Sequence, residues 1–502
     1  MRPFDILFIL ILTACSRIIE CSPLGQNESS HENPFKTPVV ILISFDGFRW
    51  DYFDRTKLEN FNYIVKNGVK ADSLQSSFIT KTFPNHFTIV TGVHEETHGI
   101  VANKMFDPVF NETFYPNNTE SKWWDAALPI WIKNEMHRDE NNNTVKSEKK
   151  GNNKKRKSAA IFWVGSNVKY NGQLPYFYFP IYNGSYPFED RFDLIVRLLK
   201  EENPPNFIAC YISEPDATGH KHGPDSIEVT KVLLQLDKLL GVFLKKLKEN
   251  RFLDFVNLVI VSDHGMASIE PNHQIALNDF IDQSWYNAVN IDVFASIIPK
   301  ANFTGKVFNQ LKRVPHLTVY LKEEIPTELH YKENRRVQRI LAIADEGYLI
   351  TLNRTVVTHT TGNHGYLNSF KSMHGIFIAA GPAFKKNYTG KTFSNVHIYA
   401  LLCSVLGIEP SPNNGSLSEV EHFLVKALKT RRVFDILSFK ITIVALITIF
   451  VIVSLIGIIL QCRGSKHYTP AGYVQASRSK DGIYLYDLTE DFALNEESSE
   501  ED

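Results

Sequence analysis

The stretch Val39-Val-Ile-Leu-Ile-Ser-Phe-Asp46-Gly-Phe-Arg49 decides the fold class, because an apolar run ends directly in a carboxylate and a glycine. A run of this kind, without polar alternation, predicts a strand that is buried on both faces, as the strands of parallel sheets are. Open parallel sheets bind ligands outside the carboxyl ends of their strands. Asp46 is therefore predicted to face a functional site.

Four more apolar runs predict strands of the same buried, parallel kind: Ala159–Val164, Phe207–Ile212, Leu258–Ser262 and Ile376–Ala380. Between them lie segments with apolar residues at helical spacing, of which Ser226–Lys248 is the longest. We therefore expect an α/β sandwich with a central, mostly parallel sheet and helices on both faces.

Four further local frames contain zinc-type ligands: Lys81-Thr82-Phe-Pro-Asn85-His86, Glu214-Pro-Asp216-Ala-Thr-Gly-His220, Ser262-Asp263-His264-Gly265 and Gly362-Asn-His364-Gly-Tyr366. Two of them follow predicted strands directly, so their side chains are expected at the edge where Asp46 lies. Zinc takes imidazole nitrogen and carboxylate oxygen, and a zinc pair can hold both the attacking and the leaving oxygen of a displacement at phosphorus. The set therefore indicates a two-metal phosphoesterase centre.

The five frames, in this order, resemble the ectonucleotide pyrophosphatase/phosphodiesterase family of the alkaline phosphatase superfamily, over roughly Thr37 to Leu424. The resemblance implies two zinc ions, one held by Asp46, Thr82, Asp263 and His264 and the other by Asp216, His220 and His364. It also implies that Thr82 is the nucleophile of a phosphothreonyl mechanism. His374 competes with His364 as a ligand, and the Gly-X-His-Gly frame favours His364.

The same resemblance implies the substrate pocket. Asn85 matches the residue whose amide donates to the phosphate, and Phe83 and Tyr182 match an aromatic pair that stacks a nucleobase. Trp163 belongs to this pocket, although the family's Trp-Pro-Gly-Ser-Asp reads Trp163-Val-Gly-Ser-Asn here, and His-Gly-Tyr-Asp-Asn reads His-Gly-Tyr-Leu-Asn. Two alternatives stay open: Thr82 as the N-cap of a helix that begins near Pro84, and Tyr182 as an ordinary core or surface residue.

The domain organisation predicted from the sequence has five parts. Residues 1–21 form a signal peptide, 37–425 the catalytic domain with a disordered basic insertion at 135–157, 441–461 a transmembrane helix, and 462–502 a cytoplasmic tail. All Asn-X-Ser/Thr sequons precede the predicted span, which favours a type I protein of the plasma membrane with its catalytic domain outside the cell.

The net charge bears on the expected partners, and the positions of the cysteines bear on disulfide formation. A net charge of −1 gives no reason to expect a nucleic-acid partner. Of the five cysteines, Cys210 and Cys403 fall in the catalytic region, in a predicted strand and a predicted helix. We expect both to be buried free thiols and not a disulfide.

The function predicted from the sequence is an extracellular, zinc-dependent nucleotide pyrophosphatase/phosphodiesterase that releases nucleoside 5′-monophosphates from extracellular nucleotides or dinucleotides. Three alternatives remain open: a choline-phospholipid phosphodiesterase on the same fold, a catalytically silent cell-surface binding protein, and an alkaline monoesterase.

Overall fold

The computed structural model describes residues 32–137, 155–354 and 360–425, with residues 445, 447–449 and 452. The chain divides into two units, residues 1–429 and 430–502, and every element below belongs to the first. The predicted signal peptide, the tail at 462–502 and residues 138–154 of the predicted insertion lie outside the described residues. So does nearly all of the predicted span at 441–461. Within the described part of the chain, no helix has the length and apolarity needed to cross a membrane.

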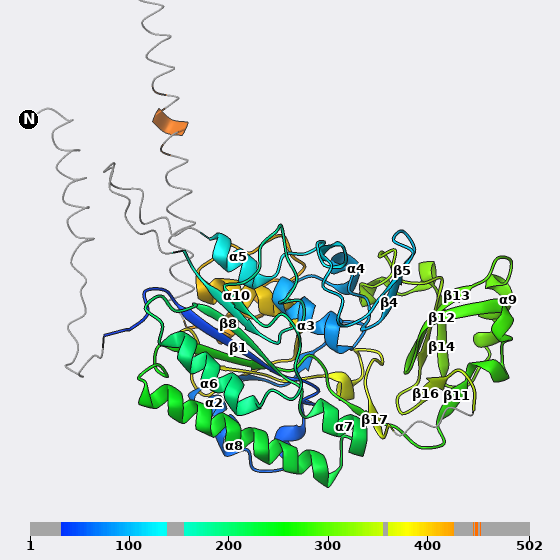
Figure 1. Cartoon of the computed structure of the whole chain (residues 1–502), viewed down its shortest axis with the longest axis horizontal. Helices are drawn as coiled ribbons and strands as arrows, with labels where there is room; N and C mark the ends of the chain where they lie inside the picture. Colours follow the sequence, from blue (N-terminus) through cyan, green and yellow to red (C-terminus); the bar gives the residue numbers. More distant parts are fainter. Residues whose placement is uncertain are drawn as a thin grey trace, which may run out of the picture. The chain divides into compact units, whose positions relative to one another are not determined.

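An eight-stranded sheet forms the centre of the catalytic unit, in the order β19-β2-β18-β9-β1-β8-β6-β7. Its strands, in chain order, are β1 (Val39–Phe45), β2 (Gly68–Ala71), β6 (Ser158–Ile161), β7 (Phe177–Tyr178), β8 (Phe207–Ile212), β9 (Val256–Val261), β18 (Phe377–Ala380) and β19 (Tyr388–Gly390). The central strand β1 pairs in parallel with both β8 and β9. The predicted α/β class is confirmed (Figure 1).

The direction of one strand of this sheet differs from the prediction. The run predicted as a parallel strand at Ile376–Ala380 forms β18, which is antiparallel to both β9 and β2. Just before β18 the chain is held at the carboxyl edge of the sheet, where Met373 O accepts from Gly265 N and Ile376 O accepts from Ser262 N. A strand that enters the sheet from this edge must run opposite to β9, so the sheet is mixed.

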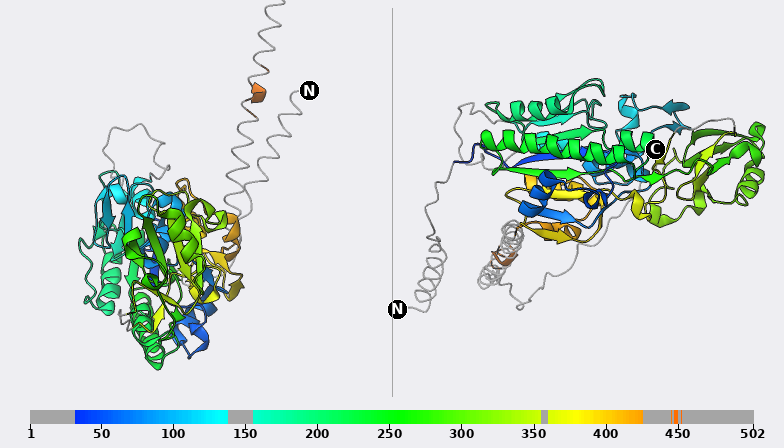
Figure 2. Two further views of the ribbon diagram at one scale, coloured as in Figure 1. Left: turned by 90° about the vertical axis from the view of Figure 1, so that its right-hand side faces the viewer. Right: turned by 90° about the horizontal axis from the view of Figure 1, so that it is seen from below.

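Alternate residues of β1 point into two separate cores. Val39, Ile41 and Ile43 belong to one buried cluster, and Val40 and Leu42 belong to the other. Helices α2 (Glu59–Asn67), α6 (Phe188–Leu199) and α8 (Ile227–Glu249) cover the first face, and α3 (Thr82–Thr91), α5 (Ile130–Met136) and α10 (Ile398–Leu406) cover the second. Figure 2 shows the two helical layers on opposite sides of the sheet. Burial on both faces explains why the strands read as continuous apolar runs.

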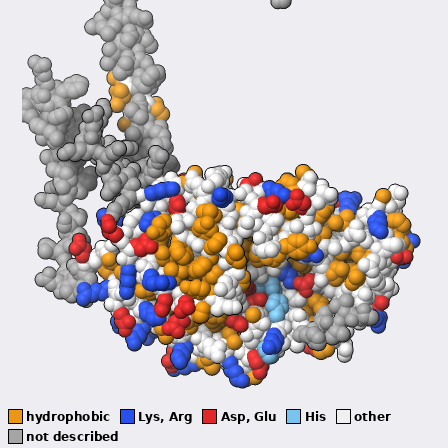
Figure 3. Space-filling view, viewed as in Figure 1, with side chains coloured by type: hydrophobic (Ala, Val, Ile, Leu, Met, Phe, Trp, Pro, Cys, Tyr) orange, Lys and Arg blue, Asp and Glu red, His pale blue; other side chains and the backbone are white. Residues whose placement is uncertain are grey.

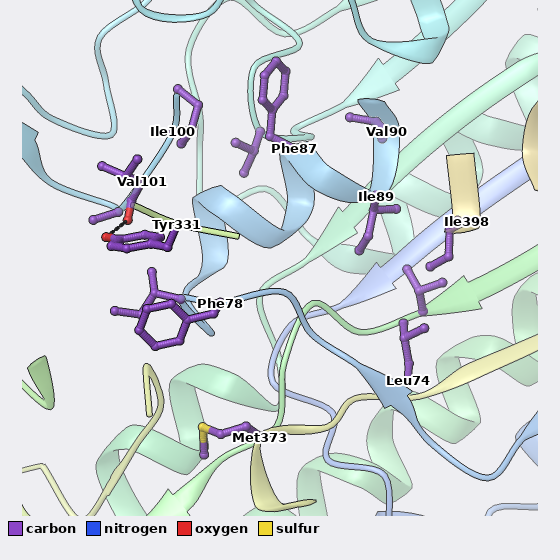
Figure 4. Packing of buried hydrophobic residues seen from close by; sticks show 14 of the residues in the cluster. Leu74, Phe78, Phe87, Ile89, Val90, Ile100, Val101, Tyr331, Met373 and Ile398 are labelled. Atoms are coloured by element: carbon purple, nitrogen blue, oxygen red, sulfur yellow. Dashed lines mark hydrogen bonds between the residues drawn. The ribbon is translucent and has the colours of Figure 1, made fainter. Parts of the chain in front are cut away.

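The packing around α3 fixes the position of the helix that begins at Thr82. Phe87, Ile89 and Val90 of α3 are completely buried in the second core, whose side chains are drawn in Figure 4. Beside them, Tyr331 donates its hydroxyl to Val101 O at 2.8 Å, and Phe78 packs edge-on to the Tyr331 ring. A helix buried on this scale presents its first turn in one defined position.

A second, smaller sheet was not predicted from the sequence. Strands β12 (Tyr286–Ile291), β13 (Phe294–Pro299), β15 (Ile340–Ala344) and β14 (Leu317–Leu321) form an antiparallel sheet with α9 (Thr304–Leu311). Strands β11 (Gln274–Ala276) and β16 (Leu349–Thr351) pair beside it. We call residues 274–351 the insert; it lies at the right-hand end of the molecule in Figure 1.

The remaining short elements are β3 (Leu74–Gln75), α4 (Glu95–His98), β4 (Met105–Asp107), β5 (Glu112–Phe114), α7 (Asp216–His222), β10 (Ala267–Ser268), β17 (Gly362–Asn363) and β20 (Phe393–Ser394). Cys210 lies in β8 and Cys403 in α10; both are buried and neither forms a disulfide, as predicted.

Candidate metal centre and active site

Strand ends bring the predicted ligands to one edge of the sheet. Asp46 follows β1, Asp216 begins α7 shortly after β8, and Asp263 and His264 follow β9. His364 comes from a different direction, since it follows the short strand β17, which pairs with β10. These side chains are far apart in the sequence but close in space, because the strands that they follow are neighbours in the sheet. Figure 3 shows histidine side chains at a hollow near the middle of one face.

Two groups of side chains have the spacing of a metal site. Asp216, His220 and His364 form one, and Asp46, Asp216 and His264 form the other, with the potential ligand atoms of each group within 4.8 Å of one another. Asp263 joins the second group, because its Oδ2 lies 2.9 Å from His264 Nε2.

Backbone carbonyls fix the orientation of the three imidazoles. The Nδ1 atoms of His220, His264 and His364 lie 2.8–2.9 Å from the carbonyl oxygens of Gly362, Gly265 and Thr80, respectively. An Nδ1–H that donates to a carbonyl leaves Nε2 with a free lone pair. All three Nε2 atoms face carboxylates, at 3.3–3.5 Å from Asp216 or Asp46. This is the tautomer that a metal ligand requires.

The carboxylates are buried with oxygens that the protein leaves unsatisfied. Within the described residues, Asp46 Oδ1, Asp216 Oδ1 and Asp263 Oδ2 are buried and have no hydrogen-bond partner. Burial, together with the charges of Asp263 and Asp216, raises the pKa of Asp46 well above its ordinary value. Burial also lowers the pKa of the His364 imidazole well below its ordinary range. A divalent cation would stabilise carboxyl groups that burial makes costly to ionise, and it would bind the free Nε2 lone pairs of the three imidazoles, so these residues fit zinc.

Further residues hold the ligands in place. Tyr211 donates its hydroxyl to Asp46 Oδ2 at 2.6 Å, and Gly47 N donates to Asp263 Oδ1 at 3.2 Å. His86 is fully buried with its Nδ1 3.3 Å from Asp263 Oδ2. Such outer contacts orient ligating carboxylates.

Thr82 lies at the start of α3 beside this centre. Its Oγ1 is 3.4 Å from His264 Nε2. The interpretation of Thr82 as the N-cap is wrong, because α3 begins at Thr82 itself and Lys81 is the N-cap. The Thr82 hydroxyl caps nothing and faces the ligand cluster.

Asn85 does not lie where the sequence placed it. The side chain is completely buried, and its Nδ2 donates to Ile79 O and Lys81 O, both at 2.9 Å. Its Oδ1 accepts from Ser77 N. With both N–H groups donated to the backbone, Asn85 has none for a phosphate, so its predicted role is wrong. It instead holds the loop that precedes the first turn of α3.

Asn103 has the free amide that Asn85 lacks. Its Oδ1 accepts from Phe83 N at 2.9 Å, which fixes the side chain at the start of α3, next to Thr82. Among the described residues its Nδ2 has no hydrogen-bond partner. Asn103 could not be predicted from the sequence, because it lies twenty residues beyond Phe83 and outside the five ligand-containing frames.

Trp163, predicted in the substrate pocket, is a core residue. Its side chain is 2% exposed, its ring packs edge-on to His86, and its Nε1 donates to His86 O at 3.2 Å. A buried indole cannot contact a substrate, so the prediction is wrong. Trp163 supports His86, which in turn contacts Asp263.

The two predicted stacking residues lie differently. Phe83 is half-buried and packs at 6.3 Å from the rings of Phe114 and Trp124. Tyr182 is 51% exposed and lies 6.0 Å from the ring of Tyr211, the residue that donates to Asp46. An exposed aromatic ring this close to a ligand-bearing residue is available to a substrate. A core role for Tyr182 is excluded by this exposure.

A partly buried ion pair connects the insert to this centre. Lys81 Nζ lies 2.5 Å from Asp292 Oδ2, in the turn between β12 and β13, and 3.2 Å from Asn363 Oδ1. Asn363 Nδ2 in turn donates to Asp292 Oδ1 at 2.6 Å. Because Lys81 precedes Thr82 and Asn363 precedes His364, the insert contacts both catalytic segments.

His374, the competing ligand, has other partners. Its Nδ1 lies 2.9 Å from Ser73 Oγ and its Nε2 3.1 Å from Asn368 O. Neither of the two ligand groups includes it. The geometry favours His364.

Comparisons with known proteins agree with this picture. A family model described as type I phosphodiesterase / nucleotide pyrophosphatase matches residues 40–367. The chain is 41% identical over 392 residues to bis(5'-adenosyl)-triphosphatase enpp4 of Mus musculus, which is 77% of this chain and 82% of that protein. It is 40% identical over 393 residues to ectonucleotide pyrophosphatase/phosphodiesterase family member 5 of Homo sapiens, 78% of each. Venom phosphodiesterase of Naja atra is 34% identical over 406 residues, 78% of this chain and 47% of that protein.

A solved structure shares the architecture. Murine ectonucleotide pyrophosphatase/phosphodiesterase 5, as an inactive threonine-to-alanine variant in complex with AMP, superimposes with a TM-score of 0.71 at 40% identity. The match covers 77% of this chain and 100% of that one.

Proposed function

The chain belongs to the ectonucleotide pyrophosphatase/phosphodiesterase family of the alkaline phosphatase superfamily, and from this premise we propose that it is a zinc-dependent hydrolase that releases nucleoside 5′-monophosphates. Family membership supports nucleotide pyrophosphatase/phosphodiesterase activity in general. The observation that carries the finer proposal is the pair of ligand groups, with three oriented imidazoles and three unsatisfied carboxylate oxygens beside Thr82.

Seven residues would hold two zinc ions: Asp46, Thr82, Asp263 and His264 the first, and Asp216, His220 and His364 the second. When bound, the ions would favour the alkoxide form of a threonine and stabilise charge on the attacking and leaving oxygens. The buried oxygens of Asp46, Asp216 and Asp263 would then each have a partner.

The reaction itself is a displacement at phosphorus in two steps. The Thr82 hydroxyl gives up its proton and its oxygen forms a bond to phosphorus, while the bond to the leaving group breaks and the leaving oxygen takes up a proton. This step gives a phosphothreonyl intermediate. Water then attacks this phosphorus, and the nucleoside 5′-monophosphate leaves as Thr82 regains its proton. Asn103 donates its free amide N–H to a non-bridging oxygen, and the positive end of the α3 helix dipole favours the phosphate.

Aromatic stacking supports a nucleotide substrate over a choline phospholipid. Tyr182 is exposed beside the centre and Phe83 lies next to Thr82, so a base can stack on either ring. The Mus musculus relative is named a bis(5'-adenosyl)-triphosphatase, and the murine structure holds AMP. A catalytically silent binding protein would not require the complete ligand set.

We further propose that the protein is a type I plasma-membrane protein with its catalytic domain outside the cell. The apolar segment at 441–461 and the distribution of sequons support this topology. Several sequon asparagines are exposed: Asn111, Asn117, Asn183, Asn302, Asn387 and Asn414. Glycosidase treatment should shift the protein on a gel, and an antibody to residues 462–502 should stain cells only after permeabilisation. Tail staining of intact cells would contradict this topology.

The activity is tested with the purified full-length protein on dinucleoside polyphosphates, nucleoside triphosphates, lysophosphocholine and p-nitrophenyl phosphate. We expect nucleoside 5′-monophosphate as a product, with little monoesterase activity. Thr82→Ala should keep its zinc and its melting temperature but lose several orders of magnitude in kcat. If Thr82→Ala retains a tenth of the activity, Thr82 is not the nucleophile.

A further inference from the structure

A chain of buried polar side chains connects helix α4 to helix α3. It begins at Glu95, the first residue of α4, whose side chain is completely buried. Glu95 Oε1 lies 2.6 Å from Ser77 Oγ, and Ser77 Oγ lies 3.1 Å from Asn85 Oδ1 on α3. The reaction described above uses neither Ser77 nor Glu95, although both are connected to the helix that begins at Thr82.

Asn85 is the member of this chain that controls the position of Thr82. Its Nδ2 donates to Ile79 O and Lys81 O, and Lys81 is the last residue before Thr82. These bonds require the amide to keep one orientation, with its oxygen turned toward Ser77. Ser77 supplies two donors to that oxygen, its backbone N at 2.9 Å and its hydroxyl at 3.1 Å. The Ser77 hydroxyl therefore helps to hold the amide, and the amide holds the loop.

Glu95 has no cationic partner. Within the described residues its Oε2 has no hydrogen-bond partner and its carboxyl group forms no ion pair. The imidazole of His98, on the same helix, is neutral, because its Nδ1 accepts from Ile100 N and its Nε2–H donates to Thr88 Oγ1, both at 3.0 Å. A buried carboxylate without a cation is costly. Burial therefore raises the pKa of Glu95 to about 8, and the group carries a proton at neutral pH.

The other titratable groups near Glu95 leave it without a counter-charge. The carboxylate of Glu96 raises the pKa of Glu95 further. Burial, together with the charge of Glu95, holds the pKa of the Tyr331 phenol well above its ordinary value. His94 and Arg336 lie near the neutral α4 imidazole, and together with burial they keep its pKa well below its ordinary value. Glu95 is therefore a neutral hydrogen-bond donor at neutral pH.

We propose that Glu95 is a positioning residue for the nucleophile. Its carboxyl group donates to Ser77 Oγ, whose hydroxyl donates to Asn85 Oδ1, and Asn85 holds the loop before the nucleophile. The proposal rests on the proposed function, in which Thr82 attacks phosphorus. An ionised Glu95 can only accept, so the Ser77 hydroxyl would turn to the carboxylate, which forms the stronger bond. Asn85 would then lose one donor, and the loop before Thr82 would lose part of its support.

Four variants separate the hydrogen bond from the packing. Glu95→Gln keeps a donor at every pH, because a side-chain amide does not ionise. Glu95→Leu removes the donor and keeps a similar volume, and Ser77→Ala removes the hydroxyl between Glu95 and Asn85. Thr91→Val is the matched control, since Thr91 is also buried on α3 and its hydroxyl donates to Phe87 O of the same helix at 2.6 Å.

The first measurement is steady-state kinetics of the full-length protein at pH 7 on p-nitrophenyl thymidine 5′-monophosphate. Displacement of a reacting group by about 1 Å can cost roughly 100-fold in rate, so we expect Glu95→Leu and Ser77→Ala to lower kcat at least about 10-fold. The KM should stay within about 2-fold of the parent value, and the zinc content should not change. Glu95→Gln and Thr91→Val should keep at least about half of the parent kcat.

The second measurement is the pH dependence of kcat in the parent and in Glu95→Gln. With a pKa of about 8, about one tenth of the parent molecules keep the Glu95 proton at pH 9. We expect the parent kcat divided by the Glu95→Gln kcat to fall roughly 2- to 10-fold between pH 7 and pH 9. Effects of pH on the metal centre cancel in this ratio, because both proteins have the same ligands.

Three results would overturn the proposal: a ratio that does not change with pH, a Glu95→Gln variant as slow as Glu95→Leu, and an unchanged kcat in Ser77→Ala. A Thr91→Val variant that loses as much kcat as Glu95→Leu would also overturn it, because it would show that any buried change on these helices slows the enzyme. If Glu95→Leu does not fold, Ser77→Ala and the pH ratio still decide.

Infrared spectroscopy separates this proposal from the proposed function. The difference spectrum between the parent and Glu95→Gln at pH 7 should contain the carbonyl stretch of a protonated carboxyl group, which should weaken as the pH rises to 9. A carboxylate signal at pH 7 would refute the positioning role of Glu95 and leave the proposed function intact. A parent protein that shows the protonated signal but releases no nucleoside 5′-monophosphate would instead refute the proposed function.

Discussion

Removal of the Asp292 carboxylate tests whether the insert positions the catalytic segments. The Lys81 side chain is 8% exposed and its ammonium is paired with Asp292, whose side chain is 34% exposed. Breaking a fully buried pair by removing one partner costs about 3–5 kcal/mol, because the remaining charge stays buried. Water reaches Asp292 in part, so we expect Asp292→Ala to lower the free energy of unfolding by about 2–3 kcal/mol.

Asp292→Ala should also lower the rate of the reaction, because Lys81 directly precedes Thr82. Displacement of a reacting group by about 1 Å can cost roughly 100-fold in rate. We therefore expect Asp292→Ala to lower kcat on p-nitrophenyl thymidine 5′-monophosphate at least 10-fold, with a smaller change in KM. Asp292→Asn keeps the shape of the side chain and should fall between the parent and the alanine variant.

Urea denaturation of the full-length protein and steady-state kinetics measure the two effects. Lys81→Met and the double variant complete a double-mutant cycle, for which we expect a coupling energy of about 1–3 kcal/mol. The reasoning is refuted if Asp292→Ala unfolds within about 0.5 kcal/mol of the parent and keeps at least half of its kcat. That outcome would show that the ion pair between Lys81 and Asp292 contributes neither to stability nor to the position of Thr82.

Three further predictions concern single side chains. His364→Ala should leave less than two zinc ions per chain and no activity, with His374→Ala much milder; a zinc loss only in His374→Ala would reverse the ligand assignment. Tyr182→Ala should raise KM for nucleotides about 5- to 100-fold, which corresponds to loss of one stacked base, and should affect bis(p-nitrophenyl) phosphate much less. Burial raises the pKa of Glu95 from 4.5 to about 8, so the folded protein holds a proton that the unfolded chain releases. The stability that this protonated group contributes is complete below about pH 4.5 and is lost as the pH rises toward 8, by up to about 1.4 kcal/mol per pH unit. Glu95→Gln should reduce the dependence of Tm on pH in this range. An unchanged dependence would show that Glu95 is ionised in the folded state.

Most of the central sheet could be predicted because its strands carry their own signal. Strands β1 and β8 follow the predicted runs residue for residue, and α8 begins one residue after Ser226, which is its N-cap. The direction of β18 could not be predicted, since a strand buried on both faces has the same apolar pattern in either direction. The short strands of the insert could not be predicted, because their sequences show no clear pattern of apolar residues.

The sequence by itself indicated which residues can bind metal, because Asp46, Asp216 and Asp263 each follow a recognisable strand. Only the tertiary structure decided between Asn85 and Asn103, since both have the same side chain and only the hydrogen bonds around them differ. The same holds for Trp163: its burial depends on His86, which lies 77 residues earlier in the chain. Residues close together in the sequence can be recognised as possible ligands from their spacing alone. Whether a side chain is free to contact a substrate depends on residues far away in the sequence, which accept its hydrogen bonds or bury its ring.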